Sequence, residues 1–242
     1  MPFSRLFSYE QRWYCSDVSV EKLSGSVQDY LKAVWVLGEW SSDPVTTSRI
    51  AERVGVRAAT ASETIKKLAA QGLVEHLPYG AITLSEEGRT LALAMVRRHR
   101  LIETFLVENL GYSWDEVHAE AEVLEHAVSD LMVERIDAAL AHPTRDPHGD
   151  PIPGPDGKLE AVPARQLTYL EAGASARVER VSDADPALLQ FLAGKGLTFG
   201  AIVRALEAEP FSETLDLEVD GVSGIASLGK TATDAVWVTV FD

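Results

Sequence analysis

The nine residues from His118 to His126 concentrate side chains that bind metal ions when they are deprotonated. The stretch reads His-Ala-Glu-Ala-Glu-Val-Leu-Glu-His, with two imidazoles and three carboxylates. At 3.6 residues per helical turn, one face of a helix would carry His118, Glu122, Glu125 and His126, with Glu120 on the other side. This stripe predicts a metal site, and a solvated acidic helix face is the alternative.

More histidine and glutamate side chains lie just before this stretch. His99 and Glu103 are four residues apart in Arg97-Arg-His-Arg-Leu-Ile-Glu103, so they share one face of a helix. If two consecutive helices pack together, these residues join His118 and its neighbours. Imidazole and carboxylate without thiolate suit a borderline-to-hard divalent ion such as Mn(II) or Fe(II), and so many ligands would fill two neighbouring sites. For any single member, a salt bridge is the alternative.

The composition limits the class of protein. The chain has 242 residues, of which 46% are hydrophobic and 24% charged, enough for two or three small domains with cores of their own. Cys15 is the only cysteine, which excludes an intrachain disulfide and a thiolate metal cage. No apolar run is long enough to cross a bilayer. We therefore expect a soluble, cytoplasmic protein with no membrane partner.

The net charge of −15 is distributed unevenly along the chain. Residues 26–100 carry ten Lys or Arg against eight Asp or Glu, a net +2. Residues 101–242 carry nine against twenty-six, a net −17. A nucleic-acid partner would therefore have to bind the first hundred residues.

The first hundred residues show the element order of a winged helix-turn-helix. Apolar spacing predicts a helix at 26–40, a short helix that begins at Thr46 or Thr47 and ends at Gly55, and a third helix at 58–71. Two short strands follow, around 73–77 and 81–84. The helix at 58–71 would be the one that enters a major groove.

The predicted recognition helix has a polar face. Hydroxyl and amine side chains contact phosphates, whereas Arg and Glu can read base edges. An ordinary amphipathic surface helix is the alternative, but the hairpin that follows favours DNA binding. The candidate DNA-binding residues are Arg57, Ala59, Thr60, Ser62, Glu63 and Lys66, with Tyr79 in the hairpin turn.

The rest of the chain predicts helices, a linker and a barrel. Ser85 caps a helix that runs to about Leu110, and a capping box at Ser113–Glu116 starts a helix that continues to about Leu140. Their apolar surface suggests a homodimer interface. A Pro- and Gly-rich linker follows at 143–164, with His142 and His148 as solvent-exposed loop residues. Alternating segments around 177–181, 201–206, 214–219 and 235–240, with a helix at 186–192, indicate a small barrel.

These elements predict an α+β fold that is mainly helical. The expected domains are a flexible arm at 1–25, a winged helix-turn-helix at 26–95, a helical metal-binding and dimerisation domain at 96–142, the linker at 143–164 and a small SH3-like β-barrel at 165–242.

The motifs together resemble the diphtheria toxin repressor family of metal-dependent transcriptional regulators. The resemblance rests on the winged helix, the segment at 97–103, Glu-Ala-Glu-Val-Leu-Glu-His at 120–126 and Asp146-Pro-His-Gly-Asp-Pro-Ile-Pro-Gly. It implies a homodimer that binds divalent metal, then binds operator DNA and represses metal-uptake genes. It also implies that the C-terminal domain is FeoA-like.

The resemblance also implies two ligand sets. One set would be Asp29, Glu122, Glu125 and His126. The neighbouring set would be His99, Glu103 and His118, completed by Asp183 or Asp185 of the barrel. Without this resemblance, Asp29 would be interpreted as a charge that stabilises a helix N-terminus.

The expected metal follows from a difference between this chain and the iron-responsive members of the family. Iron-responsive members carry methionine and cysteine where this chain has Asp29 and Glu122, and carboxylates harden the site toward Mn(II). The chain thus resembles the manganese-responsive branch, although Lys32 stands where some of its members place a glutamate. Fe(II) is the second choice, and Co(II), Zn(II) or Cd(II) would substitute in vitro. The rival functions are a metalloenzyme and a repressor that senses an organic ligand.

Overall fold

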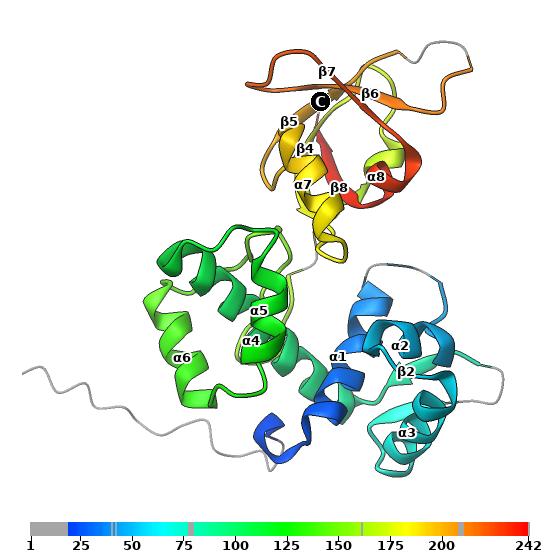
Figure 1. Ribbon diagram of the computed structural model, residues 1–242, viewed down its shortest axis with the longest axis vertical. Coiled ribbons are helices and arrows are strands. Elements are labelled where there is room, and N and C mark those ends of the chain that lie inside the picture. Colours follow the sequence, from blue (N-terminus) through cyan, green and yellow to red (C-terminus); the bar gives the residue numbers. More distant parts are fainter. Residues whose placement is uncertain are drawn as a thin grey trace, which may run out of the picture. The chain divides into compact units, whose positions relative to one another are not determined.

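The computed structural model describes residues 19–39, 41, 43–76, 80–160, 162–207 and 211–241. The fold divides into two compact units, of which the first ends at Ala92 and the second begins at Leu93. The helix α4 (Glu86–Leu110) runs through this division (Figure 1). Within the described residues, no helix has both the length and the apolar character that a membrane span requires.

The first unit has the predicted winged-helix order. Helices α1 (Gly25–Glu39), α2 (Thr47–Val54) and α3 (Ala58–Ala70) precede strands β1 (Val74–His76) and β2 (Ile82–Leu84). The two strands form an antiparallel hairpin in which Val74 pairs with Leu84. The helices and the hairpin bury apolar side chains, the largest of which are Tyr30, Leu31, Ile50, Ile65, Leu68 and Ile82.

Capping residues explain where these helices begin and end. The Thr46 hydroxyl accepts the backbone N–H of Arg49, so Thr46 rather than Thr47 caps α2. Gly55 has φ of +73°, and its N–H bonds to carbonyls of the last turn. The Ser85 hydroxyl accepts the N–H of Gly88 at the start of α4, as predicted. At Gly88 a Cβ would lie 1.9 Å from the Leu73 carbonyl oxygen, so only glycine lets the hairpin pack here.

The flexible arm predicted at 1–25 extends too far along the chain, because its last residues are structured. Residues 1–18 lie outside the described residues, but Val20–Lys22 form a 3-10 helix capped by Ser19. Val20 is buried, and the Gln28 amide donates to its carbonyl oxygen at 2.7 Å. A single buried side chain anchors this turn, and so short a contact leaves no periodicity in the sequence.

The single helix predicted over 113–140 is wrong, because the chain forms two helices there. Helix α5 (Val117–Leu124) ends before Glu125, and α6 (Asp130–Ala139) is capped by the Ser129 hydroxyl. The buried Arg98 guanidinium donates to the carbonyl oxygens of Glu125 and Val128 at 3.1 and 3.0 Å. It satisfies carbonyls that a continuous helix would have bonded internally, and this stabilises the break.

The predicted capping box also differs from the structure. The Ser113 hydroxyl donates to the Glu116 carboxylate at 2.6 Å, and α5 begins one residue after that glutamate. The pair is a side-chain contact in the turn before the helix.

The predicted linker is partly a packed segment. Arg97 and Arg100 of α4 each donate at 2.7 Å to backbone carbonyls, of Pro153 and Pro151 respectively. Ile152 belongs to the core formed by α4, α5 and α6. His148 is fully buried, so its predicted exposure is wrong, whereas the His142 side chain is 73% exposed as predicted. Proline prevents regular structure here but does not prevent burial.

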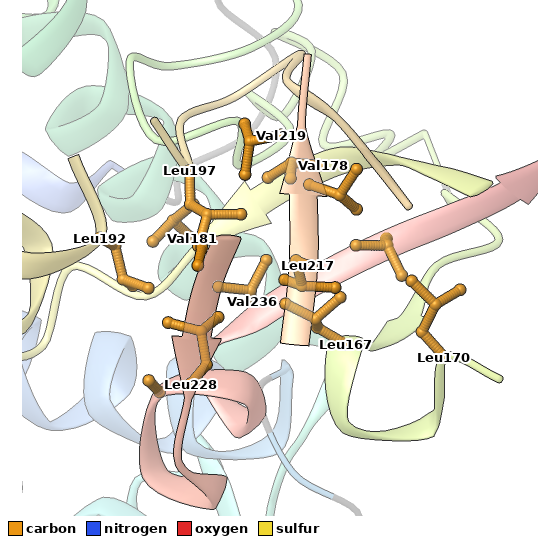
Figure 2. Close-up of a cluster of buried hydrophobic side chains, with 14 of the residues drawn as sticks. Leu167, Leu170, Val178, Val181, Leu192, Leu197, Leu217, Val219, Leu228 and Val236 are labelled. Carbon is orange, nitrogen blue, oxygen red and sulfur yellow. The ribbon is translucent and has the colours of Figure 1, made fainter. Parts of the chain in front are cut away.

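The end of the second unit is an antiparallel barrel-like sheet with strand order β3-β8-β4-β5-β6-β7. Leucine and valine side chains from these strands and α7 fill its interior, as Figure 2 shows. The four predicted strands are present, and the predicted helix is α7. The elements are β3 (Arg165–Gln166), β4 (Ser175–Val181), α7 (Pro186–Gly194), β5 (Ile202–Ala205), β6 (Leu215–Val219), β7 (Ile225–Leu228) and β8 (Val236–Phe241), with a 3-10 turn at Leu167–Tyr169 and α8 at Lys230–Asp234.

Two strands escaped sequence reasoning. β3 is two residues long, which is too short to show alternation. β7 reads Ile-Ala-Ser-Leu, and its larger first residue is exposed while its buried second residue is alanine. At these first two positions burial therefore runs against residue size, which hides the alternation of the strand.

Candidate metal centre

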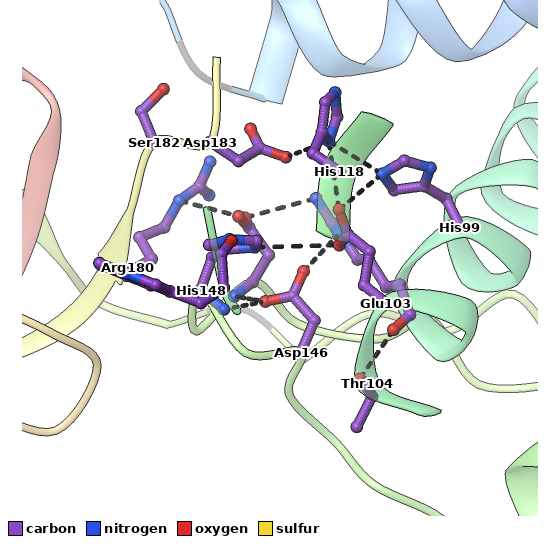
Figure 3. Close-up of polar contacts among 12 residues, drawn as sticks. His99, Glu103, Thr104, His118, Asp146, His148, Arg180, Ser182 and Asp183 are labelled. Atoms are coloured by element: carbon purple, nitrogen blue, oxygen red, sulfur yellow. Dashed lines mark hydrogen bonds and ion pairs between the residues drawn. The ribbon is translucent and has the colours of Figure 1, made fainter. Parts of the chain in front are cut away.

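One cluster gathers two histidines and two carboxylates from α4, α5 and the barrel (Figure 3). Glu103 Oε1 lies 2.9 Å from His99 Nε2 and 3.1 Å from His118 Nδ1. Asp183, which follows β4, places Oδ2 2.9 Å from His118 Nδ1. One ligand atom from each of the four residues lies within 4.8 Å of all the others. The structure therefore brings together His99, Glu103, His118 and Asp183, the residues expected for one of the two sites.

A second cluster shares His99 with the first. His99 Nδ1 lies 2.5 Å from Glu125 Oε2, and ligand atoms of His99, Glu122 and Glu125 lie within 4.8 Å of one another. His126 Nε2 is 3.7 Å from Glu125 Oε1. Three of the four residues expected for the other site are thus neighbours, although Glu125 and His126 lie in the turn after α5 and not on a helix.

Asp29 lies on α1 in the first unit, whereas Glu122, Glu125 and His126 lie in the second. Its membership of their ligand set remains a prediction of the sequence.

Electrostatics hold a proton in the first cluster when no metal is bound. Burial lowers the pKa of His118, but hydrogen bonds to Asp183 and Glu103 and their charges raise it more, to about 10. Burial raises the pKa of Glu103, yet His99, His118 and His148 together lower it well below its usual value. Burial also raises the pKa of Asp183, but the hydrogen bond to His118 and the charge of His118 lower this pKa well below its usual value. A cation in this position would replace that proton.

The donor set fits a divalent cation. Imidazole nitrogens and carboxylate oxygens converge, and Glu103 is fully buried with Oε2 lacking any hydrogen-bond partner. A buried carboxylate oxygen without a partner is costly unless a cation or donor meets it. The ligand types suit Mn(II), Fe(II) or Zn(II) rather than a soft ion.

The sequence left Asp183 and Asp185 as alternative ligands, and the structure separates them. Asp185 caps α7, where its carboxylate accepts the N–H groups of Ala187 and Leu188. Asp183 instead contacts His118.

Sequence reasoning missed Asp146 and His148 as site residues. Both are buried beside Glu103, and ligand atoms of the three lie within 4.8 Å of one another. The only signal was that Asp146 and His148 are residue types that bind metal, and the surrounding prolines led to a prediction of exposure.

The candidate DNA-binding face is on α3. Arg57 precedes the helix, and Ala61, Ile65 and Leu68 face the core. The opposite face is open to solvent at Arg57, Ala59, Thr60, Glu63 and Lys66, with Ser62 half-buried. Tyr79 lies outside the described residues.

Family models match nearly the whole chain. Residues 22–82 match the iron dependent repressor N-terminal DNA binding domain. Residues 85–154 match the iron dependent repressor metal binding and dimerisation domain, and residues 165–240 match the FeoA domain.

Individual relatives agree with these matches. The chain is 35% identical over 166 residues to the iron-dependent repressor IdeR of Mycobacterium bovis, covering 66% of this chain and 72% of that protein. A solved manganese-dependent transcriptional repressor in complex with manganese is 53% identical, with a TM-score of 0.84 over 89% of this chain and all of that one. ScaR with bound Zn2+ is 36% identical, with a TM-score of 0.75 over 88% of this chain and 98% of that one.

These matches agree with the winged helix and with the buried cluster of His and Glu. The chain belongs to the iron dependent repressor family, the diphtheria toxin repressor-type transcriptional repressors, which are not enzymes.

Proposed function

We propose that this protein is a manganese-dependent repressor that binds operator DNA as a homodimer and represses metal-uptake genes. The observation that carries the proposal is the donor set, which consists of carboxylate and imidazole with no sulfur. Glu122 lies beside His99 and Glu125, at a position where the iron-responsive members of the resembled family carry sulfur. An oxygen donor here favours Mn(II) over softer ions.

Metal would act by ordering the protein. Asp183 comes from the barrel, whereas His99, Glu103 and His118 come from the helices α4 and α5. An ion held by this set connects the barrel to the helices. Asp29, with Glu122, Glu125 and His126, would connect α1 to α5 and so fix the position of the DNA-binding unit.

DNA binding would use α3. Residues 26–100 have a net charge of +2, against −17 for the rest of the chain. Phosphates would therefore approach the first unit, where Arg57, Thr60 and Lys66 are exposed. In a dimer, two such helices would meet successive major grooves. A repressor of this kind works where the operator is, and we expect it in the cytoplasm.

Exposed apolar side chains on the helices of the second unit support a homodimer. Leu110 is 59% exposed, Val123 69%, Leu131 61% and Met132 48%. Large exposed apolar side chains on consecutive helices are typical of subunit interfaces.

The experiment that tests this function compares metals on one DNA. A duplex selected from a random pool by the Mn2+-loaded protein is titrated by fluorescence anisotropy with chelator, Mn2+, Fe2+ or Zn2+. We expect tight binding with Mn2+ and weak binding with chelator. Equal affinity with chelator and with excess Mn2+ would contradict metal-dependent repression, and activation by Fe2+ alone at matched free concentration would favour an iron-responsive regulator.

A further inference from the structure

Arg98 reaches from α4 into the turn at 125–129, which joins α5 to α6. Its Nη1 donates to the carbonyl oxygens of Glu125 and Val128 at 3.1 and 3.0 Å. Its Nη2 forms an ion pair with Asp130, the first residue of α6. The Arg98 side chain is only 3% exposed, so water competes little for these bonds. One guanidinium group therefore holds both ends of the turn.

Arg98 takes the place of backbone donors. In a continuous helix, the carbonyl oxygen of Glu125 would accept the N–H of Ser129, and that of Val128 would accept the N–H of Met132. Here the N–H of Met132 bonds to the Ser129 hydroxyl at 3.2 Å instead. A guanidinium carries five N–H groups in a planar fork, so it can bond to two carbonyls and a carboxylate at once. A lysine ammonium has no such fork.

The turn that Arg98 holds carries two of the expected ligands. Glu125 is fully buried, and its Oε2 lies 2.5 Å from Nδ1 of His99. His126 follows, with Nε2 3.7 Å from Glu125 Oε1. His99 is the residue next to Arg98 on α4. Adjacent residues of one helix therefore bond to the backbone and to the side chain of Glu125, which fixes this carboxylate beside the imidazole.

Arg97 has the same chemistry but bonds to another segment. Its Nη1 donates to the carbonyl oxygen of Pro153 at 2.7 Å, and its Nη2 lies 2.8 Å from Asp137 of α6. Each of the two arginines thus bonds to backbone carbonyl and pairs with an aspartate of α6. They differ in that Arg98 bonds to the backbone of an expected ligand, whereas Arg97 bonds to the segment after α6.

We propose that Arg98 is a positioning residue for the ligand set of Glu122, Glu125 and His126, and that it holds the turn in its ligand-presenting form before metal binds. This inference rests on the proposed metal-dependent function. Arg98 acts through the backbone of Glu125 and takes no part in coordination. A turn that is already ordered lowers the conformational cost of binding an ion.

Stepwise Mn2+ affinities of the full-length protein, measured by calorimetric titration, test this role. Glu125→Gln identifies the ion that this ligand set holds. Arg98→Lys keeps the charge but loses the fork, and we expect the affinity for that same ion to fall about 10-fold or more, as for other residues that support a ligand. Arg97→Lys is the matched control and should leave this affinity unchanged.

Double variants distinguish positioning from a general loss of stability. If Arg98 acts through Glu125, Arg98→Lys should weaken binding little further in a protein that already carries Glu125→Gln. Combined with Asp183→Asn, which affects the other ligand set, each substitution should weaken its own ion independently. A purely structural role would instead weaken both ions in every combination.

Hydrogen exchange in the metal-free protein tests the turn without any ion. The N–H groups of Ala127 and Val128 bond to the Leu124 carbonyl oxygen at 2.9 and 3.1 Å. We expect them to be as protected as the last amides of α5, and Arg98→Lys to remove this protection. If that variant folds poorly, the unmodified protein decides. Amides of the turn that are protected only after Mn2+ binds would mean that the ion orders the turn, which overturns the inference.

The outcomes separate this inference from the proposed function. Folded Arg98→Lys protein with unchanged Mn2+ affinity, or with a loss equal to that of Arg97→Lys, overturns the positioning role. So does a loss that multiplies in full with that of Glu125→Gln. A protein that binds no Mn2+, or whose operator affinity does not depend on it, would instead overturn the proposed function, while exchange in the metal-free turn would still test the contact with Arg98.

Discussion

The face of α3 and the interior of the metal centre use the same kinds of side chain in opposite ways. Glu63 and Lys66 are exposed on α3, and water screens their charges. His99 and Glu103, on α4, are buried within 2.9 Å of each other. A buried charge must be matched by a partner, whereas an exposed one adds a small independent contribution. The comparison predicts large, cooperative losses in the centre and small, additive ones on α3.

The largest effect is expected at Glu103. Glu103→Gln removes the charge that lies among His99, His118 and His148, and we expect Mn2+ affinity to fall by about 100-fold or more, since even residues that only support a ligand contribute about 10–100-fold. Calorimetric Mn2+ titration measures it. Glu108→Gln is the control, because Glu108 is exposed on the same helix. Similar losses of Mn2+ affinity in both variants would contradict the difference between buried and exposed carboxylates.

Protons should compete with the metal over a wide range of pH. Because His118 has a pKa raised to about 10 in the metal-free protein, Mn2+ must displace a proton at any lower pH. We expect affinity to rise about tenfold per pH unit between pH 6 and 8 for each proton displaced. Calorimetry in buffers of different ionisation enthalpy counts the released protons, and a count of zero at pH 7 would contradict a site at His118.

The same pKa predicts the sign of a stability change. A raised pKa means that the folded metal-free protein binds the proton more tightly than the unfolded chain does. Its stabilising contribution is complete below the ordinary histidine pKa of about 6.5 and is lost as pH rises toward 10. His118→Gln should therefore flatten the fall in thermal stability of the metal-free protein over that range.

A smaller effect is expected at the barrel aspartates. Asp183→Asn removes the charge that contacts His118 and should weaken Mn2+ binding about tenfold. Asp185→Asn, two residues later, preserves an oxygen that can cap α7 and should leave metal binding unchanged. Equilibrium dialysis of both variants against Mn2+ checks this, and an equal loss in both would indicate a general effect on the barrel.

The smallest effect is expected on α3. Lys66→Ala should weaken DNA binding several-fold, equally on all sequences, and reduce the slope of log affinity against log salt by about 1, because one phosphate contact is lost. Lys158→Ala is the control, since Lys158 is exposed in the acidic unit. Anisotropy titrations from low to moderate salt measure both. A loss of DNA affinity above 100-fold would show that Lys66 does not make a small, independent contribution to binding.

Sequence reasoning succeeded mainly where the signal was local, although the capping box at Ser113–Glu116 is an exception. Helix periodicity, the glycine at 55 and the short hairpin give the winged helix, and the i, i+4 pair of His99 and Glu103 is a property of one helix. It failed where a distant partner decided the outcome. Arg98 stabilises a break between α5 and α6 that periodicity does not show.

The sequence by itself determined the ligand types, the winged helix and the charge division, because each depends on neighbouring residues and on composition. Only the tertiary structure decided that Asp183 rather than Asp185 contacts His118, and that His148 and Asp146 lie buried beside Glu103. The reason is that burial and convergence depend on which segments meet. The prolines around His148 exclude helix and strand, but they do not determine what that segment packs against.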